Sequence, residues 1–259
     1  IREAQRRIGE GDFYEINLSH QMEATYSGDS YELYRQMRAV GPVPFGAYLT
    51  FDEWTVCSQS PERFLKKEGR RVFSQPIKGT IRRGTTALED IRLKEELQNS
   101  LKDQAENLMI VDLVRNDLSR IALNNTVLVP RLFEIQTFGT VHQMVSTIEA
   151  KTALTDPVEV IKACYPMGSM TGAPKISAMN TIEELENYQR GIYSGAIGYI
   201  NPDGDFDFSV VIRTAILKGE QLFYSVGGAI TGDSSPDAEW EETLLKARAL
   251  TRIFDDQKQ

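Results

Sequence analysis

The lysine at position 78 stands in an unusual setting for a charged side chain. It lies in "PIKGT", between Ile77 and Gly79 and just before a run of basic residues. A neutral lysine amine is a nucleophile, and burial or nearby cations lower its pKa enough to make that form accessible. A solvated turn residue would explain the same position. Upstream, Glu62 in "SPERF" is either a general acid or a partner of the adjacent Arg63.

Acidic residues on two expected helices could bind a metal ion. In "SPDAEWEETLLKARAL", Glu239, Glu242 and Lys246 share one arc, because residues three and four apart lie on one helix face. Glu106, in "AENLMIVDLV", lies on another helix that runs into the core. Carboxylates from separate helices are hard oxygen ligands of the kind that Mg²⁺ prefers. Solvated helix faces are the alternative for both groups.

Three further features could bind a small acid. The loop "GSMTGAPK" (168–175) lacks Walker A spacing, but backbone N–H groups before a helix can hold a carboxylate, and a tight turn is the alternative. Arg213 interrupts the expected strand 208–217 and needs either a ligand carboxylate or an internal Asp or Glu. His142 lies in an expected strand, where a hydrogen-bonded core histidine is the more common explanation.

The elements that must position these residues follow from hydrophobic periodicity and turn chemistry. Strands alternate with turns in antiparallel-looking pairs and the helices are bunched between them, which predicts an α+β fold rather than a doubly wound sheet. No repeat or linker interrupts the chain, so one continuous unit over 1–259 is expected. On the closing helix Trp240, Leu244, Ala247 and Phe254 are expected to face the core. Helices are expected at 1–9, 86–121 (two), from Pro157 with Asp156 as the cap, after 175 and from 236. Strands are expected at 14–22, 45–51, 54–60 and 208–217 and within 127–150. A hairpin over 63–74 is expected to turn at Glu68-Gly69, and further hairpins are expected to turn at 201–205 and 218–221.

Composition excludes several classes of protein. The 259 residues are 41% hydrophobic and 25% charged with a net charge of −8, so no nucleic-acid surface is expected. No apolar run reaches spanning length and no signal-peptide pattern opens the chain, which predicts no membrane contact and a cytoplasmic enzyme. Cys57 and Cys164 are far apart, which excludes a disulfide scaffold and a zinc site. Because the chain starts inside an expected helix without Met, it is expected to be the trailing part of a longer protein.

The motifs together resemble those of a known family. "SPERF", "PIKGT", "AENLMIVDLVRNDLSR", "GSMTGAPK", "SGAIGYI", "IRTA" and "GDSSPDAEWEETLLKARAL" occur in the order and spacing of the chorismate-utilising enzymes. These include anthranilate, aminodeoxychorismate, isochorismate and salicylate synthases. The resemblance covers nearly the whole chain and implies two large antiparallel sheets packed face to face with helices outside. It also implies Mg²⁺ as cofactor, chorismate as substrate and an additional N-terminal region.

The resemblance also implies a role for each candidate residue. Metal ligands would be Glu106 and Glu242, with Glu239 beside them, and the metal would hold the ring carboxylate of chorismate. His142 would lie by the 4-hydroxyl of chorismate, and Lys246 would lie close to the metal and substrate. The resemblance implies that the enolpyruvyl carboxylate is bound by Arg213 and Tyr193, with help from N–H groups near Gly227 and Gly228. Ser169 and the glycine-rich loop would form a further part of the carboxylate site.

The identity of residue 78 separates members of the family. Anthranilate synthases have alanine there, whereas Lys78 resembles the aminodeoxychorismate synthases, in which the amine adds to ring carbon 2 as the 4-hydroxyl departs. Ammonia, supplied by a glutaminase subunit, then attacks carbon 4 and expels the lysine. Glu62 resembles the general acid for the departing hydroxyl. At the position where water-adding members have lysine and ammonia-using members usually have glutamine, this chain has Glu15, which argues against isochorismate and salicylate synthesis and could accept a proton from ammonium.

Other functions fit the sequence less well. Anthranilate synthesis is the alternative within the family, and Lys78 argues against it. A phosphoryl-transfer enzyme would need a proper phosphate loop. A non-catalytic small-acid-binding module would keep Arg213 and the glycine-rich loop but would not need Glu62, Lys78 or the metal-binding acids.

Overall fold

The computed structural model describes residues 1–41 and 43–256. The chain forms two compact units, each assembled from separate segments. The first unit comprises Ile1–Pro61, Ser169–Ile197 and Val210–Gln259, and the second comprises Glu62–Gly168 and Gly198–Ser209. Because the chain crosses between the units without a linker, composition does not mark their boundaries. The single domain over 1–259 stays a prediction.

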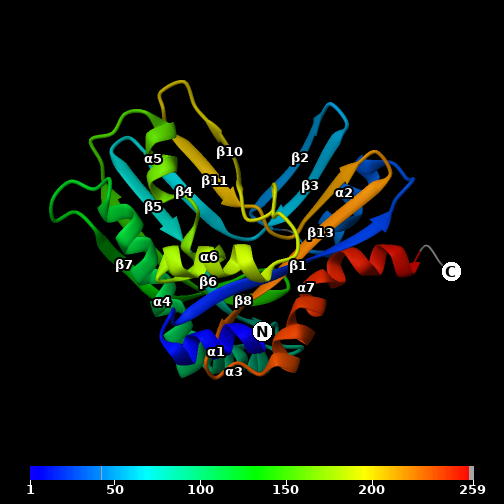
Figure 1. Cartoon of the computed structure of the whole chain (residues 1–259), viewed down its shortest axis with the longest axis horizontal. Coiled ribbons are helices and arrows are strands. Elements are labelled where there is room, and N and C mark those ends of the chain that lie inside the picture. The colour runs from blue at the N-terminus through cyan, green and yellow to red at the C-terminus, as the bar shows by residue number, and fades with distance from the viewer. Residues whose placement is uncertain (42, 257–259) are drawn as a thin grey trace. The chain divides into compact units, whose positions relative to one another are not determined.

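The first unit is built on a six-stranded sheet in the order β2-β3-β12-β13-β1-β9 (Figure 1). The strand pairs described are antiparallel, and β1 and β13 pair over their whole length. The strands are β1 (Glu15–Thr25), β2 (Phe45–Phe51), β3 (Trp54–Ser60), β9 (Gly172–Ala173), β12 (Thr214–Lys218) and β13 (Gln221–Thr231). The helices are α1 (Arg2–Glu10), α2 (Ser30–Val40), α6 (Lys175–Leu185) and α7 (Pro236–Asp256).

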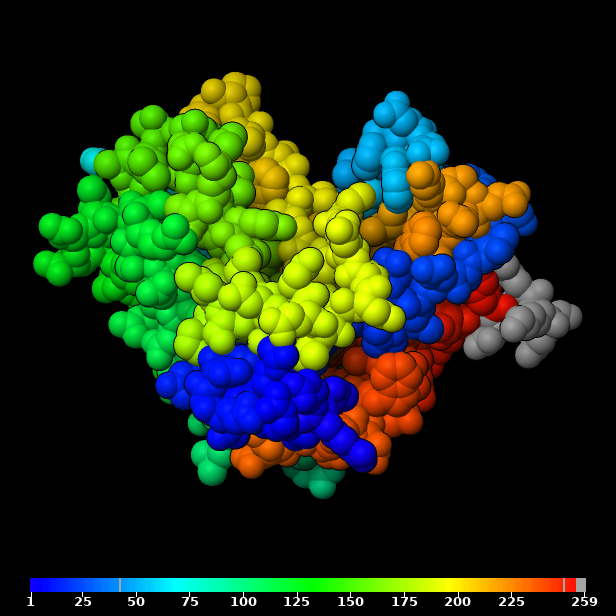
Figure 2. Space-filling view, viewed as in Figure 1, coloured from blue at the N-terminus to red at the C-terminus, as the bar shows by residue number. Residues whose placement is uncertain are grey.

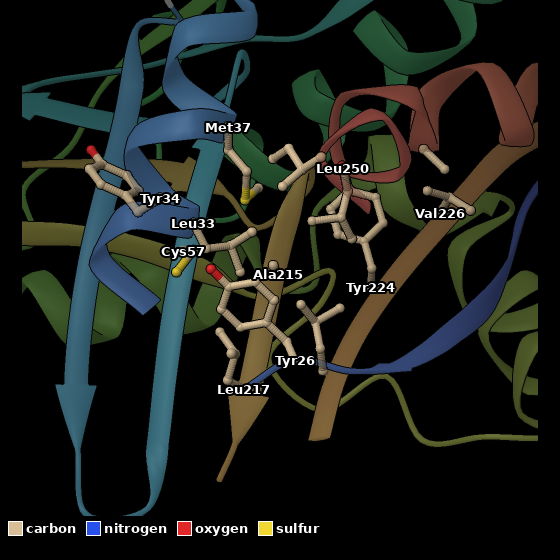
Figure 3. Close-up of a cluster of buried hydrophobic side chains, with 13 residues drawn as sticks. Tyr26, Leu33, Tyr34, Met37, Cys57, Ala215, Leu217, Tyr224, Val226 and Leu250 are labelled. Carbon is tan, nitrogen blue, oxygen red and sulfur yellow. The ribbon is translucent and has the colours of Figure 1, made fainter. Parts of the chain in front are cut away.

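Two apolar clusters hold these helices against one face of the sheet. In the first, side chains of α2 and α7 pack on β3, β12 and β13, with Leu33, Tyr224 and Leu250 among the buried residues (Figure 3). In the second, α1 and α6 pack on Ile16 and Ile230, and the two helices lie side by side at the surface (Figure 2). Ile16 belongs to the second cluster and Met22 packs against the first. The two residues are an even number of positions apart on β1, so both clusters lie on the same face of the sheet.

The second unit is built on a seven-stranded sheet in the order β10-β11-β4-β5-β8-β6, with β7 also paired to β8. Helices α3 and α4 cover β6 and β8, where Leu97, Ile135 and Met144 form a buried cluster. The strands are β4 (Arg63–Glu68), β5 (Arg71–Gln75), β6 (Ile77–Arg82), β7 (Leu128–Thr137), β8 (Val141–Lys151), β10 (Ala196–Ile200) and β11 (Phe206–Val210). The helices are α3 (Ala87–Gln98), α4 (Leu101–Ser119) and α5 (Pro157–Cys164). The short η1 (Gly168–Met170) begins at the last residue of this segment and continues into the first unit.

Most expected elements are confirmed, including the α+β class, the antiparallel sheets, the paired helices α3 and α4, and α5 with its Asp156 cap. Helix α2 was not predicted, although Asp29 caps it by accepting from the Tyr31 N–H. The prediction of one strand over 208–217 is wrong. The chain leaves β11 of the second sheet, turns through 211–213 and enters β12 of the first.

The predicted core face of α7 is also partly wrong. Trp240 is 47% exposed and lies over the ring of His20, with 4.7 Å between the ring centroids. Among the described residues, the hydrophobic side chains that α7 buries are those of Ala247, Leu250 and Ile253. Helical spacing allows either stripe, and the contact with β13 selects the second. Among the described residues, no helix is both long and apolar enough to cross a membrane.

Candidate active site

Helix α7 places three of the candidate residues against β13. The ammonium group of Lys246 donates to the carbonyl oxygen of Gly227 at 2.9 Å and lies 2.7 Å from a Glu242 carboxylate oxygen. A Cβ at Gly228 would lie 3.4 Å from Glu239 Oε2 and 3.8 Å from Lys246 Nζ. Glu239 and Lys246 therefore lie close to Gly228, and Lys246 connects Glu242 to the Gly227 carbonyl within the first unit. The roles expected for these residues stay predictions.

Glu239 is buried and held in one orientation. Its Oε1 accepts from the hydroxyl of Ser234 at 2.9 Å, and the Ser234 oxygen in turn accepts from the Thr231 N–H at 3.1 Å. This leaves Oε2 on the side of Gly228. A side chain larger than hydrogen at Gly228 would project between the carboxylate and the Lys246 ammonium group.

Tyr193 lies on the opposite face of β13. A Cβ at Gly227 would be 3.0 Å from the Tyr193 hydroxyl oxygen and 2.6 Å from the carbonyl oxygen of Leu18, so only glycine fits there. Burial raises the pKa of Tyr193, so the phenol stays protonated and can donate a hydrogen bond. Tyr193 and Gly227 are thus brought together, as the resemblance implied.

Arg213 has a strained backbone. Its φ of 52° is strained for a non-glycine residue, and its carbonyl accepts from the Gln59 N–H at 3.1 Å. Among residues 1–41 and 43–256, no carboxylate forms an ion pair with its guanidinium. Of the two alternatives left by the sequence, a ligand carboxylate is therefore favoured over an internal Asp or Glu. Nearby, burial raises the pKa of Tyr224 to about 12, and the charge of Arg213 opposes that shift.

The glycine-rich loop around Ser169 is held by a buried ion pair that the sequence analysis missed. Arg190 contacts Glu186 at 2.6 Å and also donates to the carbonyl oxygens of Met170 at 2.6 Å and Asn17 at 2.8 Å. Glu186 in addition accepts from the backbone and side chain of Ser19. The spacing of four between Glu186 and Arg190 was the available signal, but the segment is not helical.

In the second unit Lys78 lies on a strand, so the solvated-turn alternative is wrong. The β6–β8 register shifts between Ile77 and Thr80, which places the partly buried Lys78 and Gly79 at an irregularity of the sheet. Gly79 has a φ of 86°, and a Cβ there would lie 2.9 Å from Asp103 Oδ1 of α4. Glu106 is three residues beyond Asp103 and so shares the α4 face that contacts β6. Its carboxylate is 3.8 Å from the ammonium group of Lys102.

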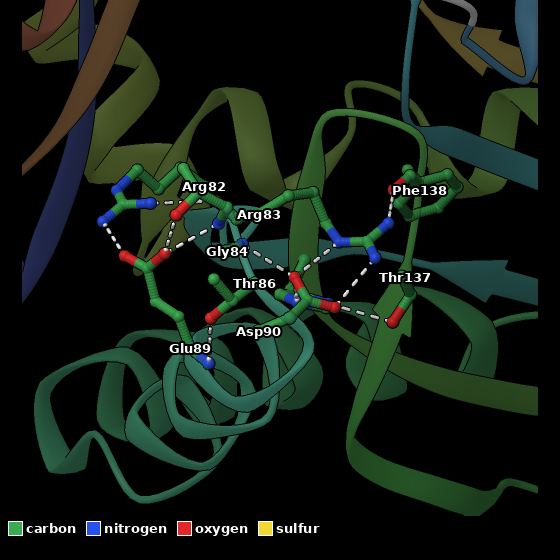
Figure 4. Close-up of polar contacts among 10 residues, drawn as sticks. Arg82, Arg83, Gly84, Thr86, Glu89, Asp90, Thr137 and Phe138 are labelled. Carbon is green, nitrogen blue, oxygen red and sulfur yellow. Dashed lines mark hydrogen bonds and ion pairs between the residues drawn. The ribbon is translucent and has the colours of Figure 1, made fainter.

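His142 is buried on β8 with both ring nitrogens hydrogen-bonded. Nδ1 lies 2.9 Å from Thr137 Oγ1 and Nε2 lies 3.0 Å from Asp90 Oδ1. Arg83, together with the Gly84 N–H, holds the pKa of Asp90 far below its usual range (Figure 4). Asp90 is therefore ionised and accepts from Nε2–H of His142. These contacts match a hydrogen-bonded core histidine. The expected position of His142 beside a substrate hydroxyl stays a prediction.

The roles expected for Glu62 and for the three metal-binding glutamates stay predictions. Glu62 is buried and directly precedes β4 in the chain. The next residue, Arg63, forms a two-point ion pair with Asp207. Within either unit, the described residues contain no group of three His, Cys, Asp or Glu side chains arranged as metal ligands. The expected set takes Glu106 from one unit and Glu239 and Glu242 from the other, so it too stays a prediction.

Comparisons with known proteins agree on the family. A family model described as chorismate binding enzyme matches residues 1–252. Aminodeoxychorismate synthase of Streptomyces griseus is 47% identical over 97% of this chain and 35% of its own length. Aminodeoxychorismate synthase component 1 of Escherichia coli is 41% identical over 98% of this chain and 56% of its own length. The crystal structure of anthranilate synthase component I from Streptococcus pneumoniae is 34% identical and superposes with a TM-score of 0.87, covering 96% of this chain and 56% of that one.

Proposed function

This chain belongs to the chorismate binding enzymes, and we propose that it carries the active site of an aminodeoxychorismate synthase. The reaction would convert chorismate and ammonia to 4-amino-4-deoxychorismate. The chain spans about a third to just over half the length of the two relatives named above. Their names support this activity.

The position of Lys78 is the observation that carries the proposal. A partly buried lysine beside a left-handed glycine, at an irregular point of β6, is constrained in a way that a surface lysine is not. In the proposed reaction, the neutral amine forms a bond to ring carbon 2, both conjugated double bonds of the ring shift by one position and the bond from carbon 4 to its hydroxyl breaks. Glu62 would protonate that hydroxyl, which leaves as water. Ammonia then bonds to carbon 4, both double bonds shift back and the Lys78 amine is released.

Substrate binding would use groups of complementary charge. Arg213 offers a guanidinium that pairs with no carboxylate among residues 1–41 and 43–256, and Tyr193 offers a phenolic donor beside Gly227. Both suit the enolpyruvyl carboxylate of chorismate. Ser169 and the N–H groups near Gly228 would add neutral donors, and His142 would lie near the 4-hydroxyl.

The acidic residues fit a magnesium ion by their chemistry. Glu239 is fixed by Ser234, and Glu242 lies one turn along the same helix. With Glu106 they would supply hard carboxylate oxygens. Mg²⁺, when bound, supplies positive charge for the ring carboxylate of chorismate. Lys246 would balance the negative charge of Glu242 and hold the Gly227 carbonyl.

The remaining parts of the proposal concern the nitrogen source. We propose that a glutaminase subunit in the cytoplasm supplies the ammonia, and the component 1 naming of the Escherichia coli relative supports a partner component. Ammonium salts should therefore support turnover, and glutamine should do so only when the partner subunit is added.

Anthranilate synthesis is the second candidate, favoured by the similarity to the pneumococcal anthranilate synthase structure. It would require pyruvate release after amination. Chromatography of a reaction containing chorismate, Mg²⁺ and ammonium chloride separates the two. We expect 4-amino-4-deoxychorismate without pyruvate. Accumulation of anthranilate and an equal amount of pyruvate would contradict the proposal.

A further inference from the structure

Among the described residues, Asn17 is one of those with a buried hydrogen-bond acceptor that no other group satisfies. It lies on β1 opposite Ala229 and is 9% exposed. Its side-chain Nδ2 donates to the carbonyl oxygen of Ser169 at 3.3 Å. Its Oδ1 is buried and, within the part of the chain that the structure describes, accepts no hydrogen bond. Burying an acceptor without a hydrogen bond costs free energy. The presence of such an acceptor at Asn17 therefore points to a ligand that donates a hydrogen bond to it.

The orientation of this amide is fixed by its surroundings. Exchanging Oδ1 and Nδ2 would set the amide oxygen against the Ser169 carbonyl oxygen, two acceptors in contact. The backbone is held on both sides as well. The Asn17 N–H donates to Thr171 O at 2.7 Å, and its carbonyl accepts from Arg190 at 2.8 Å. Asn17 therefore presents Oδ1 in one direction.

We propose that Asn17 Oδ1 binds the ammonia molecule consumed in the reaction, an inference that rests on the proposed function. Ammonia has three N–H donors and one lone pair. A hydrogen bond from one N–H to Oδ1 leaves the lone pair available to attack carbon. Chorismate carboxylates are acceptors and are repelled by an amide oxygen, so they do not compete for this atom.

The same face of β1 carries a second acceptor. Glu15 is buried two residues before Asn17, about 7 Å along the strand, and so projects to the same side of the sheet. An amide oxygen and a carboxyl group on one face favour a small donor over an anion. The alternative donor is the single hydroxyl of chorismate, and the test separates the two.

The test is steady-state kinetics on the intact protein, varying ammonium chloride at saturating chorismate and then the reverse. Asn17→Ala should raise the KM for ammonia about three- to tenfold, the value of one neutral hydrogen bond, and leave the KM for chorismate within about twofold. Asn17→Asp keeps an oxygen in place of Oδ1 and should give a smaller rise. Gln21→Ala is the matched control, because Gln21 projects from the same face of β1 but donates to Ser225.

Each outcome decides the assignment. An unchanged KM for ammonia in Asn17→Ala would overturn the assignment. A rise confined to the KM for chorismate would also overturn it, because Oδ1 would then accept from the substrate hydroxyl instead of from ammonia. If Asn17→Ala does not fold, Asn17→Asp decides: a rise in the KM for chorismate alone overturns the assignment. Wild-type protein without ammonia-dependent turnover would overturn the proposed function, and this assignment with it.

Discussion

Lys246 donates its ammonium hydrogen bond to the carbonyl oxygen of Gly227, 2.9 Å away across the contact between α7 and β13. The same group lies 2.7 Å from Glu242. Lys246→Met keeps the length of the side chain and removes both contacts. We expect the KM for chorismate to rise at least about tenfold, because a charge-assisted hydrogen bond is lost at the site. Arg248→Met, an exposed cation on the same helix, is the control and should behave as wild type. Wild-type kinetics for Lys246→Met would remove Lys246 from the substrate site.

Glu242→Gln tests the magnesium assignment. It removes one carboxylate charge from a set that would need several to hold Mg²⁺, so we expect activity to fall at least about a hundredfold and the Mg²⁺ concentration for half activity to rise. The unfolding midpoint should change little because Glu242 is exposed. Glu241→Gln changes the neighbouring exposed residue and should be silent. Full activity of Glu242→Gln, or of wild type in excess chelator, would refute the metal site.

Arg190 and Glu186 form a buried ion pair beside the glycine-rich loop, with side chains 15% and 3% exposed. Arg190→Met leaves the Glu186 charge buried without its partner, and we expect a loss of about 3 kcal/mol in the free energy of unfolding. Glu186→Gln/Arg190→Met should be more stable than Arg190→Met alone, because the uncompensated charge is gone while the acceptor for Ser19 remains. Chemical denaturation measures both. A double variant less stable than Arg190→Met would contradict this account.

The Arg83–Asp90 pair predicts a particular pH dependence. Arg83 and the Gly84 N–H lower the pKa of Asp90 in the folded protein, so the stability that this carboxylate contributes is present above its unfolded pKa and is lost as pH falls through the folded value. The difference in unfolding free energy between wild type and Arg83→Met should therefore be equal at about pH 7 and about pH 5, and should shrink only below about pH 4. Arg92→Met, an exposed residue of α3, is the control. A difference that already shrinks between the two higher pH values would show that another group controls it.

The elements set by local chemistry were predictable from the sequence. Asp156 before Pro157 and Gly69 in the β4–β5 turn fix their backbones through capping and left-handed geometry, and both appear where expected. The grouping of Glu239, Glu242 and Lys246 on α7 followed from helical spacing alone.

Long-range pairing was not predictable in the same way. The apolar run 208–217 supplies β11 to one sheet and β12 to the other, with a break at 211–213. Hydrophobic periodicity does not predict where such a break falls. The buried contacts of Arg190 join Met170 and Asn17, far apart in sequence. The unpartnered Oδ1 of Asn17 is likewise a property of tertiary packing, and asparagine in a strand carries no sequence signal for it.

Lys78 gives the most specific prediction. As a covalent nucleophile, it should form an adduct when the protein is incubated with chorismate and Mg²⁺ in the absence of ammonia. Intact-mass spectrometry should show protein heavier by chorismate minus water, and peptide mapping should place the added mass on "PIKGT". The adduct should disappear on addition of ammonium chloride, since ammonia attacks carbon 4 and releases the amine.

Two substitutions separate nucleophilic from electrostatic action at this position. Lys78→Ala should abolish the adduct and slow amination at least about a hundredfold, within the range expected for loss of a catalytic group. Lys78→Arg should be equally slow, because the guanidinium stays protonated and cannot add to carbon. Lys94→Ala, an exposed lysine of α3, should retain both adduct and activity. A lysine that only screens the substrate carboxylates predicts the reverse: no mass increase in wild type and a partly active Lys78→Arg. That pair of results would leave Lys78 with an electrostatic role, and the case for amination over anthranilate synthesis would then rest on the identity of the product alone.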